Sequence, residues 1–277
     1  MTTFEEFLKE KQYLQDVSHH TLAFYRQSFK AFNLQEPVTQ SQLNERVAQL
    51  RQAGKFVACV DAYIRGINPF LAWLHENQIV KEPLRVKRLK LPKRVCRTFS
   101  EPELRAIISF KPPASLRRIH TLVLLALDTG CRIDELLTLQ RSKVDFDNLL
   151  ISVRGKGNKE RVIPFSYELR KVLFKFLKNH NFNLVFVNRH GGKLLYDNTR
   201  REYLRLLEKL GITKCDGSFH SLRRAFAKNY VRRGGNLFYL QQAMGHSDLK
   251  TTRGYVEVEV EALKETHLRT SMLNRLG

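Results

Sequence analysis

Apolar residues recur three and four positions apart through the first eighty residues of the chain. Clear examples are Phe4 with Phe7, and Leu22, Tyr25, Phe29 and Phe32. This period gathers apolar side chains on one face of an α-helix. Because Pro37 and Gly54 interrupt the pattern, we predict four helices that form a small bundle. Their expected ranges are 3–14, 19–34, 40–53 and 56–78.

A second group of helices is predicted from Ser100 onward. The sequence SEPE at 100–103 combines a hydroxyl N-cap, an early proline and a glutamate three residues on, which is typical of a helix start. An apolar helix through 122–127 ends at Gly130, and another helix begins at Arg132. Later helical patterns cover about 167–179, 197–210, 221–233 and 236–244.

Strand-like patterns are confined to a short part of this second region. The β-prone runs 149–153 and 161–165 flank a glycine-containing turn, which indicates a hairpin with Lys156 in its loop. A further short strand is expected at 184–187. The pattern as a whole predicts a mainly α fold with a small β-sheet, and 277 residues are enough for two domains with separate cores.

The net charge is +21, with an isoelectric point near 10.1, and it indicates a polyanionic partner such as nucleic acid. Residues 1–80 contain eight basic and eight acidic side chains, whereas residues 81–100 contain eight basic and one acidic. No apolar run reaches the roughly 18 residues of a membrane span, and no secretory leader is visible. We therefore expect a cytoplasmic protein that is associated with the nucleoid when it binds DNA.

Four cysteines are scattered widely along the chain, at Cys59, Cys96, Cys131 and Cys215. They form neither the CxxC pairs of a zinc site nor a disulfide framework. We expect free reduced thiols and no metal site.

The strongest local concentration of charge is at 85–97, where seven basic residues and no acidic one surround Pro92. We interpret residues 85–98 as an interdomain linker. Like charges held this close repel unless phosphates neutralise them, which favours DNA contact over a merely solvated surface. The expected DNA-binding residues are Arg85, Lys87, Arg88, Lys90, Lys93, Arg94 and Arg97.

Three further segments place arginines, histidines and a tyrosine in compact settings. They are TGCRIDELL at 129–137, HSLRR at 220–224 and GHSDLKTTRGY at 245–255. In this order and spacing, together with the hairpin lysine, they resemble the motifs of the tyrosine recombinases, the family of phage integrases and of Cre-like and Xer-like recombinases. Each motif alone is weak, but their coincidence is specific. The resemblance covers residues 100–277.

The resemblance implies a fold and an activity. The expected domains are a helical, SAM-like core-binding domain at 1–84 and an α+β catalytic domain at 99–277. The expected reaction is site-specific recombination, in which duplex DNA is cut and rejoined through a 3′-phosphotyrosyl intermediate without cofactor or metal. The resemblance also implies a tetramer on DNA, with a second recombinase or an accessory protein as an optional partner. A C-terminal helix at 260–276 would dock on a neighbouring protomer or fold back on its own domain.

The resemblance also assigns roles to individual residues. The catalytic set is Arg132, Lys156, His220, Arg223, His246 and Tyr255, with Tyr255 as nucleophile, and Glu135 is a supporting residue that orients the catalytic cations.

Elementary chemistry agrees with these assignments. An attacked phosphodiester gains negative charge on its nonbridging oxygens, and an always-charged guanidinium fork suits that charge. A phenol with a pKa of about 10 needs a base or a cationic field, and the departing 5′-oxygen needs an acid, for which Lys156 is the candidate.

Two other functions remain compatible with the sequence. A type IB topoisomerase uses similar Tyr, Arg, Lys and His chemistry to relax supercoils. A non-catalytic DNA-binding regulator on the same scaffold would account for the positive charge equally well. The intact catalytic set favours the recombinase.

Overall fold

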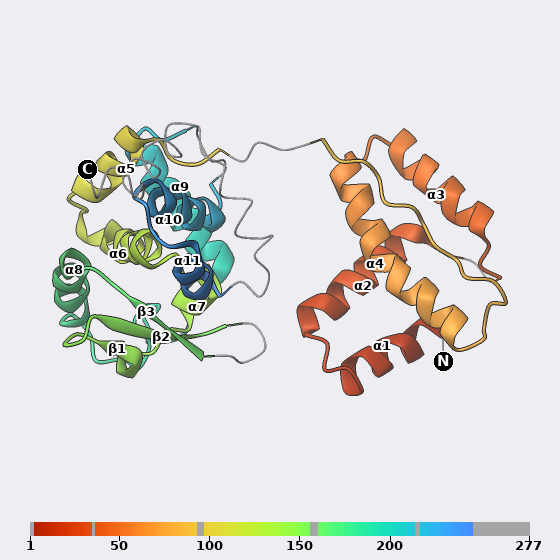
Figure 1. Ribbon diagram of the computed structural model, residues 1–277, viewed down its shortest axis with the longest axis horizontal. Helices are drawn as coiled ribbons and strands as arrows, with labels where there is room; N and C mark the ends of the chain where they lie inside the picture. Colours follow the sequence, from red (N-terminus) through yellow and green to blue (C-terminus); the bar gives the residue numbers. More distant parts are fainter. Residues whose placement is uncertain (1–2, 35–36, 93–96, 156–159, 214–216, 246–277) are drawn as a thin grey trace, which may run out of the picture. The chain divides into compact units, whose positions relative to one another are not determined.

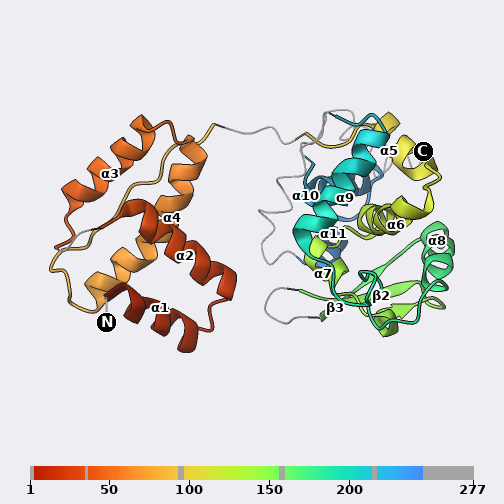
Figure 2. The same cartoon turned by 180° about the vertical axis from the view of Figure 1, so that it is seen from behind.

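The structure is a computed structural model that describes residues 3–34, 37–92, 97–155, 160–213 and 217–245. The chain divides into two compact units, residues 1–94 and 95–277. Figures 1 and 2 show the two units from opposite sides. Lys93, Arg94, Lys156, His246 and Tyr255 lie outside the described residues, as does the segment 260–276.

The N-terminal unit is the helical bundle that the apolar pattern predicted. Its helices are α1 (Thr3–Tyr13), α2 (His19–Phe32), α3 (Gln40–Gln52) and α4 (Val57–Glu76). Each predicted range agrees with the observed helix to within two residues at either end. Ser18 caps α2 and Thr39 caps α3, since each side chain accepts a hydrogen bond from a backbone N–H in the first turn.

Helix α4 forms the centre of this unit and packs against α1, α2 and α3. Its buried face includes Ile64, Ile67 and Leu71, none of which is exposed. Gly66 allows the close approach of α2, because a Cβ atom there would lie 2.1 Å from Oγ of Ser28.

The basic segment that follows α4 differs from the linker we predicted. Val86 is buried in the core of the N-terminal unit, and its backbone exchanges two hydrogen bonds with the amide side chain of Asn68. Arg88 donates two hydrogen bonds to the buried Asp61 carboxylate, at 2.6 and 2.7 Å. This pairing could not be predicted from the sequence, because Asp61 lies 27 residues earlier in a helix. Residues 85–89 are therefore part of the first unit.

The C-terminal unit is mainly helical and contains one small sheet (Figure 1). Its helices are α5 (Glu101–Ser109), α6 (Ala114–Thr129), α7 (Ile133–Leu137), the 3-10 helix η1 (Arg141–Lys143), α8 (Tyr167–Leu177), α9 (Tyr196–Lys209), α10 (Phe219–Arg232) and α11 (Leu237–Met244). Its strands are β1 (Val144–Asp145), β2 (Leu150–Arg154) and β3 (Glu160–Pro164). Among the described residues, no helix is long and apolar enough to cross a membrane.

The sheet is antiparallel with the order β1-β2-β3. The hairpin of β2 and β3 is confirmed and pairs Ile151 with Ile163, both of which are buried. The strand predicted at 184–187 is wrong, since this segment makes only isolated bridges, from Leu184 to Gln140 and from Val187 to Lys193. Its apolar run reflects burial rather than sheet pairing, because Val185 and Phe186 have no exposed surface.

Helix α6 is the central helix of the C-terminal unit and packs against α8, α9 and α10. It ends at Gly130, whose φ of +64° is a left-handed cap that glycine adopts without strain. A Cβ atom at this position would lie 2.3 Å from the ring of Phe226 on α10. Gly130 therefore combines a conformational and a packing requirement, and it directs the chain toward Arg132.

We expect Gly130→Ala to lower the free energy of unfolding of the C-terminal unit by about 2–5 kcal/mol, since it adds both left-handed strain and overpacking. Gly211→Ala is the matched control. Gly211 has a φ of +69° in the same unit but nothing within 4 Å of an added Cβ, so we expect a loss of only about 1–2 kcal/mol. Denaturant titration measures both values, and equal losses would show that contact with Phe226 is unimportant.

Candidate active site

The first predicted catalytic arginine, Arg132, is the N-cap residue of α7. Its backbone N–H donates to Oε2 of Glu135 at 2.7 Å, and its Nη1 donates to Oε1 of the same carboxylate at 3.2 Å. About a third of the Arg132 side chain is exposed. The guanidinium is thus held at its inner side by Glu135 and remains accessible to a ligand from solvent.

Glu135 is buried and has a second arginine partner that the sequence analysis missed. Arg161, on β3, donates Nη1 and Nη2 to the two carboxylate oxygens at 2.7 and 2.8 Å. Burial alone would raise the pKa of Glu135, but hydrogen bonds and charge from Arg161 and Arg132 outweigh it and lower that pKa. Glu135 therefore stays ionised and holds two guanidiniums.

Arg161 had one sequence feature that could have identified it. It is a charged residue at the start of an otherwise apolar run, and it lies opposite Val153 in the hairpin. A buried carboxylate usually needs more than one partner, and Glu135 had only Arg132 assigned to it. The pairing itself joins residues 26 positions apart, so that it depends on the tertiary fold.

The second predicted catalytic arginine, Arg223, lies on α10 and is only 3% exposed. Its Nη1 donates to the Gly130 carbonyl at 2.5 Å, and its Nη2 donates to the Met244 carbonyl. These contacts tie α10 to the end of α6 and to the end of α11. Arg223 is thereby fixed in the same region as the α6–α7 turn that carries Arg132.

Three arginines from three different elements meet at the C-terminal end of α11. Arg161 donates Nε to the Ala243 carbonyl at 2.9 Å, Arg223 donates to the Met244 carbonyl, and Arg132 donates Nη2 to the Gly245 carbonyl at 3.2 Å. The last carbonyls of a helix carry partial negative charge, which cations stabilise. The arrangement concentrates positive charge around one helix end, with Glu135 as its buried carboxylate.

His220 is the second residue of α10, three positions before Arg223, and it is exposed. Residues three apart lie on the same helix face. His220 is therefore at the solvent end of the face on which Arg223 is buried.

Cys131 directly precedes Arg132 in the sequence, but its thiol is unreactive. Burial raises the pKa of its thiol to about 11, and the negative charge of Glu135 acts in the same direction. A thiol with this pKa stays protonated at neutral pH and is a poor nucleophile. Cys59 and Cys131 are free thiols in the part of the chain that the structure describes, where no cluster of three metal-ligating side chains occurs.

Three members of the predicted catalytic set, Lys156, His246 and Tyr255, fall outside the described residues. Of the predicted DNA-binding residues, Lys93 and Arg94 also lie outside them, whereas Arg85, Lys87, Arg88, Lys90 and Arg97 are exposed. The structure therefore brings together Arg132, Glu135 and Arg223, with His220 on the same helix as Arg223.

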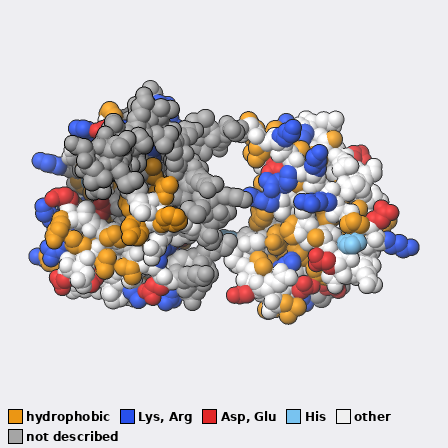
Figure 3. Space-filling model, in the orientation of Figure 1, with side chains coloured by type: hydrophobic (Ala, Val, Ile, Leu, Met, Phe, Trp, Pro, Cys, Tyr) orange, Lys and Arg blue, Asp and Glu red, His pale blue; other side chains and the backbone are white. Residues whose placement is uncertain are grey.

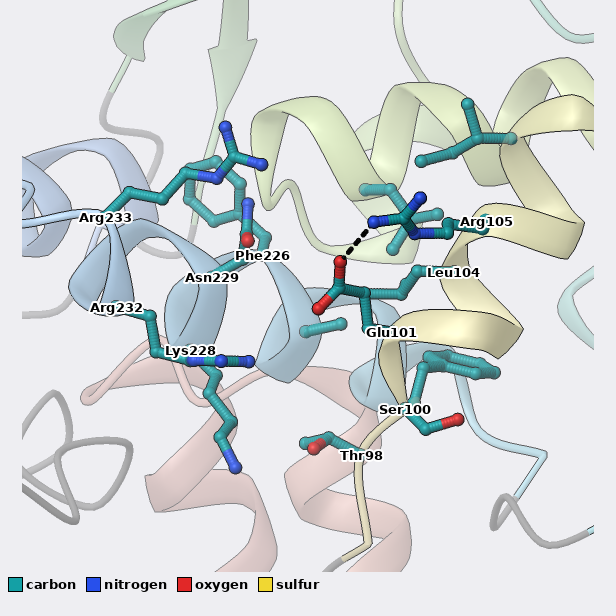
Figure 4. Close-up of a pocket in the computed structure, with 14 residues that line it drawn as sticks. Thr98, Ser100, Glu101, Leu104, Arg105, Phe226, Lys228, Asn229, Arg232 and Arg233 are labelled. Carbon is teal, nitrogen blue, oxygen red and sulfur yellow. Dashed lines mark hydrogen bonds and ion pairs between the residues drawn. The ribbon is translucent and has the colours of Figure 1, made fainter. Parts of the chain in front are cut away.

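A separate pocket of about 600 Å³ lies between α5 and α10 in the same unit (Figure 4). Its wall includes Phe226 and Leu104, and Figure 4 shows Glu101 paired with Arg105 at its edge. Arg105, Arg232 and Arg233 lower the pKa of Glu101 through a hydrogen bond from Arg105 and through charge. Of the predicted catalytic residues that the structure describes, Arg132, His220 and Arg223, none lines this pocket.

Comparisons with known proteins identify the family of the chain. The model of the phage integrase family matches residues 97–262, which is more than half of the chain. The chain is 28% identical over 234 residues to tyrosine recombinase XerD of Oceanobacillus iheyensis, covering 79% of this chain and 77% of that relative. It is 31% identical over 224 residues to tyrosine recombinase XerC of Pediococcus pentosaceus, covering 74% and 72%.

The fold has solved counterparts as well. The structure matches the Tn1549 transposon integrase in complex with a circular intermediate DNA with a TM-score of 0.78, at 17% identity, over 98% of this chain and all of that one. At this identity the likeness concerns the fold alone. With the family match and the two arginines that the fold brings together, the chain belongs to the phage integrase family and is a tyrosine recombinase.

Proposed function

We propose that this recombinase cuts and rejoins DNA by transferring a DNA 3′-phosphate to Tyr255, with Arg132, Lys156, His220, Arg223 and His246 as the other catalytic residues. The observation that carries the proposal is the meeting of Arg132 and Arg223 at the end of α11, immediately before the segment that contains His246 and Tyr255. The relatives favour recombination over DNA relaxation or regulation alone.

The two arginines have different surroundings, and each suits one part of the task. Arg132 is partly exposed, so that a phosphodiester can approach its guanidinium directly. Arg223 is buried, and its charge acts on the same region at short range in a medium that screens it weakly. Preorganised cations stabilise the added charge of a pentacoordinate phosphate without reorganising during the reaction.

The reaction balances without an external energy source. The Tyr255 oxygen attacks phosphorus, the 5′-oxygen of the next nucleotide leaves, and Lys156 donates a proton to that oxygen. The phenol proton passes to a base, for which His220 is the candidate. The 5′-hydroxyl of a second strand then attacks the phosphotyrosine and regenerates the tyrosine, so that the number of phosphodiester bonds is unchanged.

DNA binding involves both units in this proposal. Exposed basic residues at 85–97 supply phosphate contacts, except that Arg88 already pairs with Asp61 and contributes a smaller share. Residues 1–80 have no net charge, and in the view of Figure 3 Lys and Arg gather on the upper part of the N-terminal unit, which also contains the exposed basic residues of 85–92. A one-sided basic face suits a domain that grips DNA.

We also propose four copies assembled on two DNA sites, because strand exchange needs two cut duplexes and one tyrosine for each strand. The C-terminal segment 260–276 is the proposed contact between neighbours, on the basis of its apolar residues Leu263, Leu268, Met272 and Leu276.

The test is formation of a covalent adduct on a nicked duplex, from which the short cleaved strand diffuses away and traps the intermediate. The duplex is first selected from a fragment pool by its binding to the protein. We expect an SDS-resistant adduct with the wild-type protein and with Tyr239→Phe, but none with Tyr255→Phe. Tyr239 is an exposed tyrosine on α11 and is the matched control.

DNA binding is measured for each variant. Strand-exchange products with wild-type protein would identify recombination rather than relaxation. An adduct that persists in Tyr255→Phe, or no adduct on DNA that the protein binds, would contradict the proposal.

A further inference from the structure

Arg161 connects its hairpin to two other elements of the C-terminal unit. Its three guanidinium nitrogens are all used, two by the oxygens of Glu135 and one by the Ala243 carbonyl. Its side chain is only 12% exposed. One side chain therefore joins β3 to α7 and to α11, which are the elements next to both proposed catalytic arginines.

The end of α11 is packed directly against this guanidinium. Gly245 has a φ of +61°, and a Cβ atom there would lie 3.1 Å from Cζ and from Nη1 of Arg161. Contacts of this length are tighter than ordinary van der Waals packing, so only glycine fits without moving Arg161. The backbone at Gly245 is thereby held on one side by Arg161, while its carbonyl accepts from Arg132.

Glu135 and the end of α11, which Arg161 holds, are both hydrogen-bond partners of Arg132. Glu135 orients Arg132 through the backbone and through Nη1, and the Gly245 carbonyl receives Nη2 of the same guanidinium. Arg161 holds both of these partners, but it forms no hydrogen bond with Arg132, because both guanidiniums are donors only. A change at Arg161 would reach Arg132 only through Glu135 and the end of α11.

We propose that Arg161 is a positioning residue for DNA cleavage. It holds Glu135 and the end of α11, and it thereby sets the geometry of Arg132 and of the backbone immediately before His246. The proposal rests on the proposed function of Arg132 and His246. It assigns Arg161 no contact with DNA.

Lysine at this position would keep the positive charge but lose the geometry. An ammonium is a single point donor, whereas the guanidinium serves two carboxylate oxygens and a carbonyl in one plane. Displacement of a reacting group by about 1 Å can lower a rate by about 100-fold. We therefore expect Arg161→Lys to lower the single-turnover rate of adduct formation about 10- to 100-fold on saturating nicked DNA, with DNA affinity changed by less than about threefold.

Arg118→Lys is the matched control. Arg118 also joins a carboxylate and a backbone carbonyl within the C-terminal unit, through Glu202 and Val187, and it bonds to none of the site residues that the structure describes. We expect its adduct rate to stay within about twofold of wild type. The thermal unfolding of both variants is recorded, and rates are compared at a temperature at which each is folded.

The pH dependence of the rate separates positioning from a general structural effect. Charged or titratable groups around Glu135 are Arg132, Arg161 and Cys131, with Lys143, Arg154 and Glu160 lining the adjacent hollow. In Arg161→Gln the carboxylate loses its main partner, so that burial raises its pKa. The ratio of variant to wild-type rate should then fall as the pH is lowered from neutral, since protonated Glu135 no longer holds Arg132.

The outcomes distinguish a failure of the proposed function from a failure of the positioning role of Arg161. A wild-type protein that forms no adduct on bound DNA would overturn the proposed function. A wild-type adduct with an Arg161→Lys rate within twofold of the Arg118→Lys rate would overturn the positioning role alone. A rate loss that matches the unfolded fraction, or a rate ratio for Arg161→Gln that is independent of pH, would show that Arg161 is merely structural.

Discussion

Replacement of Arg223 by lysine is expected to lower the rate of adduct formation by about 100- to 1000-fold, the usual effect of removing one preorganised donor from a charged transition state. The guanidinium is buried and donates to the Gly130 and Met244 carbonyls at once. A lysine has neither the planar fork nor the reach to make both contacts, and it would leave one carbonyl unpaired. Single-turnover cleavage of nicked DNA measures the loss.

Arg232→Lys is the control for this experiment, because Arg232 lies at the other end of the same helix, outside the arginine cluster. We expect its cleavage rate to stay within about twofold of wild type. Binding of Arg223→Lys to intact DNA should change far less than its rate, since affinity comes from many phosphate contacts. A cleavage rate for Arg223→Lys close to that of Arg232→Lys would contradict the role assigned to Arg223.

Replacement of Glu135 by glutamine is expected to lower the free energy of unfolding of the C-terminal unit by about 3–5 kcal/mol, the typical cost of removing one partner of a buried ion pair. The Glu135 side chain is only 4% exposed, and its loss would leave Arg161 at 12% exposure without a counter-charge. Denaturant titration measures the change. Glu168→Gln removes an exposed ion pair with Lys171, and we expect less than about 1 kcal/mol from it.

The lowered pKa of Glu135 also predicts how the free energy of unfolding varies with pH. The pKa of Glu135 is lower in the folded protein than its ordinary value, so the folded state binds its proton less readily than the unfolded state. The stabilisation is therefore complete above the ordinary pKa of a glutamate and is lost as the pH falls through the lowered value. In Glu135→Gln this part of the acid dependence should disappear, and an unchanged acid dependence would contradict it.

Much of the fold could be predicted from sequence, because helix periodicity and caps are local. The ranges of α1 to α4 and of α8 to α11 followed from apolar spacing to within two residues, and the end of α6 followed from Gly130, whereas its start at Ala114 was not predicted. The segment 184–187 was misread, because a short apolar run is equally compatible with a strand and with a buried loop. Strand β1 has two residues, which are too few to show the alternation of apolar and polar positions that identifies a strand.

The site was predictable only as far as its motifs are contiguous. Arg132 with Glu135 and His220 with Arg223 each lie within one turn of a helix, so spacing placed them on one face. Arg161 and the carbonyls of α11 join them only in three dimensions. A sequence does not show which backbone carbonyls accept hydrogen bonds from side chains. The ion pair of Arg88 with Asp61 was not predicted because its two residues lie 27 positions apart.

The central claim is that Tyr255 carries the DNA during recombination, and the most direct measurement is the location of the nucleotide on the trapped adduct. The adduct on nicked DNA is digested with protease and nuclease, and the peptides are sequenced by tandem mass spectrometry. The account predicts a nucleotide 3′-phosphate on the peptide that contains Tyr255, attached to that side chain. Attachment to any other residue would contradict it.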